Sequence, residues 1–199
     1  MKLYLSTIGI AMAVIAAINI AVGTAPWYYV ILAVIWCTAL QFLLDGLAAL
    51  LIHWLPNRYF EVDHPYFQVS ESERKLYNRL NVRLWKDRVW ELGGLGGFSK
   101  SRLLFPNDSA YIEQFIIECN KGVITHRISY ALGFLAILTL KGTCALTVAI
   151  PVALVNLYLN ILPTMVLRYN TPKLQSVLSR LQRKRERAEV EEMENAAVL

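Results

Sequence analysis

Charged side chains are scarce in this sequence and unevenly distributed. Only 18% of the 199 residues are Asp, Glu, Lys or Arg, whereas 56% are hydrophobic. The stretch from Leu3 to Val22 carries no charge, and a helix needs about 20 such residues to cross the hydrocarbon core of a bilayer. This scarcity argues against an ordinary soluble domain and predicts a membrane protein.

The short motifs of common enzyme classes are also missing. The sequence contains no GxSxG, HExxH, Walker or dinucleotide-binding fingerprint, so a catalytic site must be argued from individual side chains near the membrane surface. The three cysteines, Cys37, Cys119 and Cys144, form no CxxC pair and lie in or beside apolar stretches. We expect them to be packing residues, and we expect neither a metal site nor a resident cofactor.

Two apolar segments at the start of the chain predict a transmembrane hairpin. Leu3–Val22 is followed by Trp27–Trp54, and only an uncharged turn at residues 23–26 separates them. A cleaved leader is the alternative for the first segment, although its apolar stretch exceeds the usual core of a signal peptide.

A later apolar segment predicts two more crossings. Lys141 and Gly142 divide it into Ile128–Leu140 and Thr143–Leu167. Because Ile128–Leu140 has only 13 residues, a tilted or re-entrant element is the alternative, and three crossings would then result.

The positive charges predict the orientation in the membrane. Of the 20 Lys and Arg residues, 11 lie between Arg58 and Arg127 and seven between Arg168 and Arg187. Basic segments remain on the cytoplasmic side, so we expect a multi-pass cell-membrane protein with both termini in the cytoplasm. The net charge of +5 suits anionic lipid head groups better than nucleic acid.

The predicted fold is all-α and polytopic, divided into a transmembrane hairpin (1–55), an interfacial segment (56–127), a transmembrane pair (128–167) and a basic amphipathic tail (168–199).

The interfacial segment mixes aromatic with basic residues, which is typical of the lipid head-group region. A leucine repeat predicts one amphipathic helix over Glu71–Glu91, begun by Ser70 or Ser72 and ended by the glycines at 93–97. We interpret these glycines as a hinge, and a phosphate-binding loop is the weaker alternative. A second helix should begin near Ala110, capped by Asp108 or Ser109.

Glu118 and His126 form the best candidate for a catalytic pair. They lie eight residues apart on one predicted helix, so they share a broad face, and a histidine can take a proton from a hydroxyl while a carboxylate orients the ring. The alternative is structural, with His126 at the interface and Glu118 paired with Lys121.

Three polar residues in the predicted spans also need explanation. Asp45 is costly in hydrocarbon unless it is paired, and Arg168 is a candidate partner. Asn156 and Asn160 share a helix face and can hydrogen-bond across helices.

Four segments occur in a characteristic order and spacing. They are Leu55–Phe60, Val82–Lys86, Glu118–His126 and Arg168–Leu174, the last containing RYNxPxL. In this pattern the chain resembles the glycosyl-4,4'-diaponeurosporenoate acyltransferase family over roughly Leu55–Arg187. The resemblance implies a membrane enzyme of carotenoid biosynthesis that transfers a fatty acyl group to the sugar of a glycosylated carotenoid acid.

The resemblance and the basic residues together lead to a hypothesis for the site. His126 is the general base and Glu118 orients it, while Arg83, Lys86 and Arg168 bind the phosphates of the donor or the developing oxyanion. Trp85, Tyr169 and Asn170 are expected in the same donor-binding region. The donor is expected to be acyl-CoA and the acceptor a lipid-soluble glycoside, with membrane lipids and other pathway enzymes as partners.

Two noncatalytic hypotheses remain open at this point. The chain could be a scaffold or lipid-binding partner that docks another enzyme through its interfacial helix. It could also be a small transporter or channel subunit whose path is lined by Asp45, Asn156 and Asn160.

Overall fold

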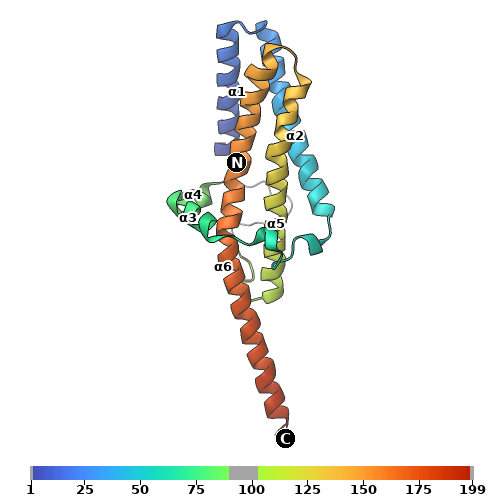
Figure 1. Cartoon of the computed structure of the whole chain (residues 1–199), viewed down its shortest axis with the longest axis vertical. Helices are drawn as coiled ribbons and strands as arrows, with labels where there is room; N and C mark the ends of the chain where they lie inside the picture. Colours follow the sequence, from blue (N-terminus) through green and yellow to red (C-terminus); the bar gives the residue numbers. More distant parts are fainter. Residues whose placement is uncertain (1, 90–102, 198–199) are drawn as a thin grey trace. The chain divides into compact units, whose positions relative to one another are not determined.

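The computed structural model describes residues 2–89 and 103–197 (Figure 1). Of these described residues 86% are helical, and none forms a β-strand. This confirms the predicted all-α fold. The same residues include four helical segments that are long and apolar enough to cross a membrane: Tyr4–Val22, Trp27–Trp54, Ser109–Thr139 and Ala145–Ala196.

The chain divides into two compact units. The first, which we call the bundle unit, consists chiefly of Met1–Leu55 and Gly122–Met165. The second, which we call the polar unit, consists of Pro56–Asp87, the described part of Glu91–Lys121, and Val166–Leu199.

The predicted N-terminal hairpin is present in the bundle unit. Helix α1 (Lys2–Val22) and helix α2 (Trp27–Trp54) pack side by side, as Figure 1 shows. Gly23 has a φ of +70° in the turn, a conformation that a side chain with Cβ rarely adopts. Pro26 then precedes the first turn of α2, where it leaves no hydrogen bond unmade within the helix.

Helix α5 (Ser109–Leu132) begins where the sequence indicates. The Asp108 Oδ1 atom accepts hydrogen bonds from the backbone N–H groups of Ala110 (2.9 Å) and Tyr111 (3.2 Å), so Asp108 is the cap. The 3₁₀-helix η5 (Gly133–Thr139) follows directly, giving a helical segment of 31 residues. This segment is long enough for a full crossing, so the short stretch 128–140 is only its apolar end.

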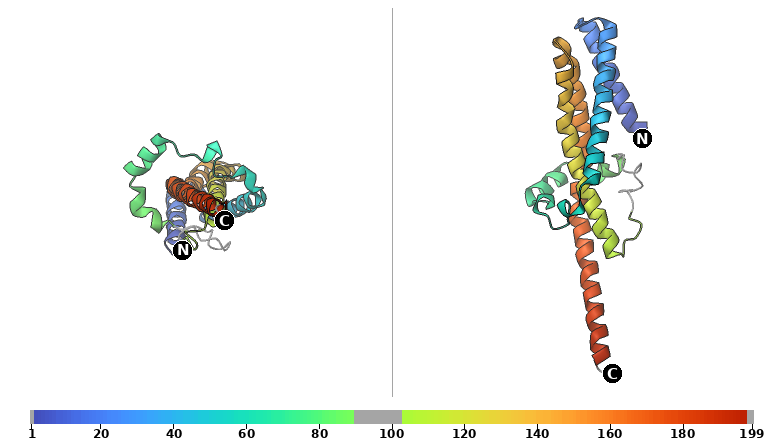
Figure 2. Two further views of the ribbon diagram at one scale, coloured as in Figure 1. Left: turned by 90° about the horizontal axis from the view of Figure 1, so that it is seen from below. Right: turned by 90° about the vertical axis from the view of Figure 1, so that its right-hand side faces the viewer.

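The last helical segment differs from the prediction. A π-helical turn, η6 (Ala145–Ala149), leads into α6 (Ile150–Ala197), which continues for 48 residues without a break (Figure 2). The sequence predicts a basic tail (168–199) that is separate from the apolar segment before it, whereas both belong to this one helix. Proline removes only one backbone N–H, and the buried side chains of this stretch hold the helix through Pro172.

The predicted helix Glu71–Glu91 is also wrong as a single element. It consists of α3 (Glu71–Arg79), the short α4 (Val82–Trp85) and the 3₁₀ turn η3 (Lys86–Arg88). Asn81 causes the break, because its φ of 48° lies in the left-handed region that asparagine tolerates better than most residues. Ser70 caps α3 as predicted, since its Oγ accepts from the Glu73 N–H (3.2 Å). Glu91, the glycines at 93–97 and the proposed hinge lie outside the described residues.

The apolar core of the bundle unit is built mainly from small side chains. Small residues let helix backbones approach closely in a membrane, where there is no hydrophobic force between helices. Cys37 and Cys144 are buried in this core and Cys119 is buried elsewhere, and none of these three residues forms a disulfide, which agrees with the packing role expected for them. The buried core residues are Ile15, Ala33, Val34, Cys37, Ala136, Cys144, Val148, Ala149 and Val152.

One buried asparagine compensates for a proline in this core. Pro151 has no N–H, so the carbonyl of Thr147, four residues earlier, lacks its usual helical donor. Asn19 of α1 supplies a donor instead, because its Nδ2 lies 2.9 Å from the Thr147 oxygen. Asn19 is only 3% exposed, and its Oδ1 accepts from the Thr24 hydroxyl (2.9 Å). This contact connects α1 to the start of the last helical segment.

Substitution of Asn19 by leucine should destabilise the bundle unit by about 1 kcal/mol, because the Thr147 carbonyl loses its donor in a buried site. Equilibrium unfolding of the purified protein in mixed detergent micelles would measure this loss. The exposed neighbour change Ile18→Leu is the control and should have no effect. The loss should be smaller in a Pro151→Ala background, where a backbone N–H is restored, and an equal loss in both backgrounds would contradict the contact.

Candidate functional site

A layer of polar side chains lies inside the bundle unit. Asn156, Asn160 and Thr164 occur at intervals of four residues, so they share one face of α6, and each is at most 9% exposed. Gln41 and Asp45 are likewise four residues apart on α2. The members of this polar layer are Gln41, Asp45, His126, Ser129, Asn156, Asn160 and Thr164.

His126 is oriented by Asn160. The distance between His126 Nδ1 and Asn160 Oδ1 is 2.8 Å. The Asn160 Nδ2 donates to both the backbone oxygen and the Oδ1 of Asn156, each at 3.0 Å, so the Asn160 Oδ1 is the atom turned to the imidazole. An amide oxygen only accepts hydrogen bonds, and His126 Nδ1 must therefore carry the proton. In the neutral ring the lone pair is then on Nε2, the nitrogen that can act as a base.

Asp45 is held by the same asparagine. Its Oδ2 lies 3.5 Å from Asn160 Nδ2, and the side chains of Ser129 and Asn156 also approach the carboxyl group. The predicted pairing with Arg168 is wrong, since the guanidinium of Arg168 pairs with a carboxylate of the polar unit. Contacts with neutral amide and hydroxyl groups thus lower the free-energy cost of burying Asp45.

Gly133 makes room for the polar layer. The Gln41 Nε2 donates to the Gly133 backbone oxygen (2.7 Å), and Asn156 Nδ2 donates to the Ser129 oxygen (3.3 Å). A Cβ atom at position 133 would lie 2.6 Å from Gln41 Oε1 and 2.8 Å from Asn156 Nδ2. No residue other than glycine fits there without displacing one of these amides.

Glu118 has partners of its own in the polar unit. Its Oε1 accepts from Gln114 Nε2 (3.0 Å) and lies 3.6 Å from Lys121 Nζ. The structure therefore favours the structural alternative for Glu118, and Asn160 takes the orienting position at His126 that the sequence assigned to Glu118. Lys121 is only 8% exposed, and its Nζ also lies over the ring of Phe60, 5.8 Å from the centroid.

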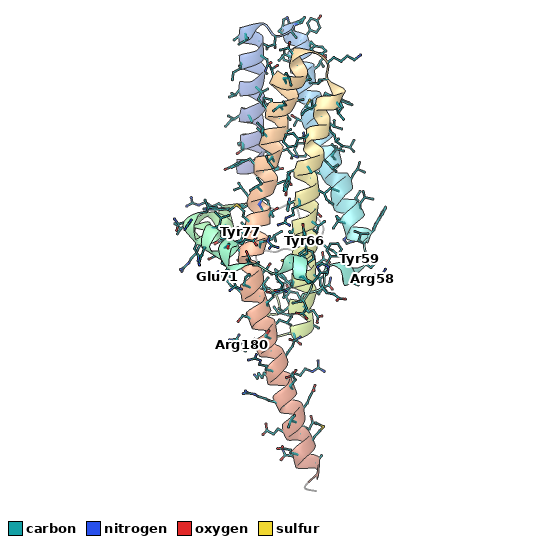
Figure 3. All side chains as sticks on the ribbon, viewed as in Figure 1. Arg58, Tyr59, Tyr66, Glu71, Tyr77 and Arg180 are labelled. Carbon is teal, nitrogen blue, oxygen red and sulfur yellow. The ribbon has the colours of Figure 1, made fainter. Side chains whose placement is uncertain are left out.

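Arg168 is the centre of a buried cluster in the polar unit. Its Nη1 and Nη2 donate to the backbone oxygens of Tyr66 (3.4 Å) and Gln68 (3.1 Å), and its Nε and Nη2 form a two-point ion pair with Glu73. The Tyr77 hydroxyl donates to the same carboxylate. Figure 3 labels Tyr66 and Tyr77 in this cluster. Burial raises the pKa of the Tyr77 phenol, and the contact with Glu73 raises it further, so this proton stays in place.

The other predicted donor-binding residues all belong to the polar unit. Arg83 is exposed, and the Lys86 side chain is 24% exposed and paired with Asp87. Trp85 Nε1 donates to the Leu80 oxygen (3.0 Å). Tyr169 and Asn170 are partly buried on α6, and the Lys173 Nζ lies 4.1 Å from the centroid of the Tyr169 ring.

Sequence reasoning missed four residues of the site. Gln41, Ser129, Gly133 and Thr164 were not selected, although Gln41 lies four residues from Asp45 and Thr164 four residues from Asn160, so each pair shares one face of a predicted span. Those intervals were the available signal for Gln41 and Thr164. Ser129 and Gly133 contribute mainly backbone oxygens and space, which no residue pattern indicates. Within residues 2–89 and 103–197, no group of three or more His, Cys, Asp or Glu side chains could hold a metal ion.

Gly133→Ala should disrupt the polar layer, because the new methyl group must displace the Gln41 or Asn156 amide. We expect a destabilisation of about 1–3 kcal/mol, measured by unfolding in mixed micelles. Gly46→Ala on α2 is the matched control, since a Cβ there meets nothing within 4 Å and should leave stability equal or slightly higher. Equal behaviour of the two variants would show that Gly133 does not border a tightly packed layer.

Comparison with known proteins places this chain in a family. The sequence pattern of the glycosyl-4,4'-diaponeurosporenoate acyltransferases matches residues 56–180, which is more than half of the chain and includes both His126 and Asn160. No curated protein matches the chain, and no solved structure matches it either. The extent of the family match shows that the chain belongs to the glycosyl-4,4'-diaponeurosporenoate acyltransferase family, and it is a membrane acyltransferase.

Proposed function

We propose that the chain transfers a fatty acyl group from acyl-CoA to a sugar hydroxyl of a glycosylated carotenoid acid or a similar membrane glycolipid. The observation that carries this proposal is the contact of 2.8 Å between His126 Nδ1 and Asn160 Oδ1. A histidine held in one tautomer inside a membrane bundle suits proton transfer from an alcohol that is itself attached to a lipid. Membership in the acyltransferase family supports the reaction type.

The proposed chemistry needs one base and one leaving group. His126 Nε2 takes the proton of the sugar hydroxyl as the oxygen attacks the carbonyl carbon of the acyl thioester. The tetrahedral intermediate collapses, the bond between carbon and sulfur breaks, and the coenzyme A thiolate leaves. The imidazolium then returns its proton to the thiolate, so that an ester and a free thiol are formed. Asn160 keeps the ring aligned throughout, because its oxygen accepts from Nδ1 in both protonation states.

The donor is assigned to the polar unit. Arg83 and Lys86 offer cations for the phosphates of coenzyme A, with Trp85, Tyr169 and Asn170 as further donor-binding residues. Arg168 has its donors occupied by Glu73 and by two backbone oxygens, so we assign it to holding the polar unit together in place of the predicted phosphate contact. Since acyl-CoA is cytoplasmic, this arrangement requires both basic segments and both termini to face the cytoplasm of the cell membrane.

His126→Ala should lower the acyl transfer rate by about 10²–10⁴-fold, the usual contribution of a general base. The measurement is mass spectrometry of lipids after the purified protein is incubated with acyl-CoA and a glycosyl carotenoid, where the product is heavier by one fatty acyl group. Asn160→Ala should lower the rate by about tenfold or more, because the ring loses its orienting partner in a buried site.

Glu118→Gln is the matched control for these variants, because it changes the carboxyl group that the sequence alone selected. Its rate should stay within about twofold of the original. A folded His126→Ala protein with an undiminished rate would contradict the role of His126. A cell extract whose lipids show no acylated glycoside when the gene is expressed would instead contradict the acyl-transfer proposal and favour a noncatalytic scaffold.

The double variant Arg83→Ala, Lys86→Ala should raise the KM for acyl-CoA by about tenfold or more with a smaller change in kcat, because two phosphate contacts are lost. Steady-state kinetics with varied acyl-CoA would measure this change. The KM for the glycosyl acceptor should stay constant. The exposed pair Arg183→Ala, Lys184→Ala is the charge-matched control. If the double variant of Arg83 and Lys86 had the same KM for acyl-CoA as the unaltered protein, these two residues would not belong to the donor site.

A further inference from the structure

A small cavity lies within the bundle unit between α1, α2 and α6. Its volume is about 30 Å³, and it is partly open to the outside of the bundle. A cavity needs roughly 10–15 Å³ to hold one water molecule, so this cavity has room for a small polar group. The residues that line it include Ala11, Thr38, Gln41, Phe42, Asp45 and Asn156.

Three residues of α2 that line this cavity each carry a buried oxygen atom without a hydrogen bond. Thr38 Oγ1, Gln41 Oε1 and Asp45 Oδ1 are buried and have no partner within the described part of the chain. Gln41 is only 5% exposed, so its unpaired oxygen is not hydrated from the molecular surface. A buried polar atom without a partner costs about 1–3 kcal/mol, and three of them at one cavity indicate a ligand that supplies hydrogen bonds.

The chemistry of these oxygens limits the ligand. The Gln41 oxygen can only accept a hydrogen bond, Asp45 Oδ1 accepts when ionised, and Thr38 can accept or donate. No Lys or Arg lines the cavity, so a phosphate or a carboxylate would find no cation and would meet Asp45. A group with several hydroxyl protons fits, because it can donate to all three oxygens. The remaining lining residues are mostly apolar and suit an alkyl or polyene chain.

The cavity adjoins the polar layer that contains His126. Asp45 lines the cavity, and its Oδ2 lies against the Asn160 amide, which in turn contacts His126 Nδ1. Asn156 also lines the cavity and accepts from the same amide. A hydroxyl-bearing group in the cavity would therefore be one side chain away from the residues that orient the proposed base.

We propose that this cavity is the acceptor-sugar site, in which hydroxyl groups of a membrane glycoside donate to Thr38, Gln41 and Asp45. The inference rests on the proposed function and extends it, because it makes α1 and α2 part of the acceptor site. Both helices precede the residues 56–180 that match the family. The cavity holds one edge of the sugar, and the lipid chain lies along the apolar residues of α1 and α6.

Photolabelling of the full chain in lipid nanodiscs tests this site without relying on activity. The probe is an alkyl glucoside with a diazirine in its chain, and a diazirine fatty acid of equal length is the sugar-free control. The glucoside should label residues that line the cavity, such as Met12, Phe42 and Leu159, and excess unlabelled octyl glucoside should remove the label. Equal labelling by both probes, or labelling confined to outward residues such as Ile10 and Ile18, would overturn the proposal.

A pair of α1 variants separates the cavity from general lipid contact. Ala11→Phe places a ring into the cavity from the α1 side, whereas Ala13→Phe adds the same ring at an exposed position that does not line it. Ala11→Phe should reduce glucoside labelling by about tenfold, and Ala13→Phe should leave it unchanged. Thr38→Val, which removes one hydroxyl group at similar volume, should weaken binding by about fivefold. Unchanged labelling in both Ala11→Phe and Thr38→Val would overturn the site.

The labelling and the activity can fail independently. If the cavity is labelled as expected but no acyl group is transferred, the proposed function is wrong and the glycoside site stands. If acyl transfer proceeds at the same rate and with the same acceptor KM in Ala11→Phe, the function stands and the acceptor binds elsewhere.

Discussion

The hydrogen bonds of the Asn160 amide connect the side chains on which the proposed chemistry depends. This one group contacts His126 on α5, Asp45 on α2 and Asn156 on its own helix. Inside a membrane bundle the local dielectric is low, so each of these contacts is stronger than in water and more costly to leave unmade. Because Oδ1 only accepts and Nδ2 only donates, the contact with Asn156 fixes which nitrogen of His126 carries the proton.

That layer can form only because helix backbones approach closely around it. Gly133 leaves space for two amides, and Asn19 replaces the donor that Pro151 removes from the Thr147 carbonyl. Both features satisfy backbone oxygens with side-chain amides, which is a common way to stabilise helix contacts where lipid offers no hydrogen bonds. The small side chains of the apolar core permit the same close approach elsewhere in the bundle unit.

The four membrane-length helices of the described residues could be predicted from the sequence because lipid solvation acts on each segment separately. A charge-free run such as Leu3–Val22 is sufficient to predict its own helix. The wrong predictions concern places where side-chain packing or backbone geometry determines the secondary structure. Prediction separated a basic tail from the apolar segment at residue 168, yet α6 continues through this point, where Arg168 and Thr171 are buried. It also missed the break at Asn81, since a left-handed residue leaves no mark in the spacing of leucines.

The candidate site was likewise predictable only in part. Residue types indicated which side chains matter, but their pairing depends on how the helices pack. His126, Asp45, Asn156 and Asn160 stand out singly, because polar groups in apolar segments need a reason. Their pairing did not follow, since Asn160 is 34 residues from His126 and 115 from Asp45, and a sequence separation of that size specifies no distance. The charge of Arg168 suggested the wrong partner for Asp45 for the same reason. Neutral amides can also accommodate a buried carboxyl group, and only the arrangement of α2, α5 and α6 determines which group is in reach.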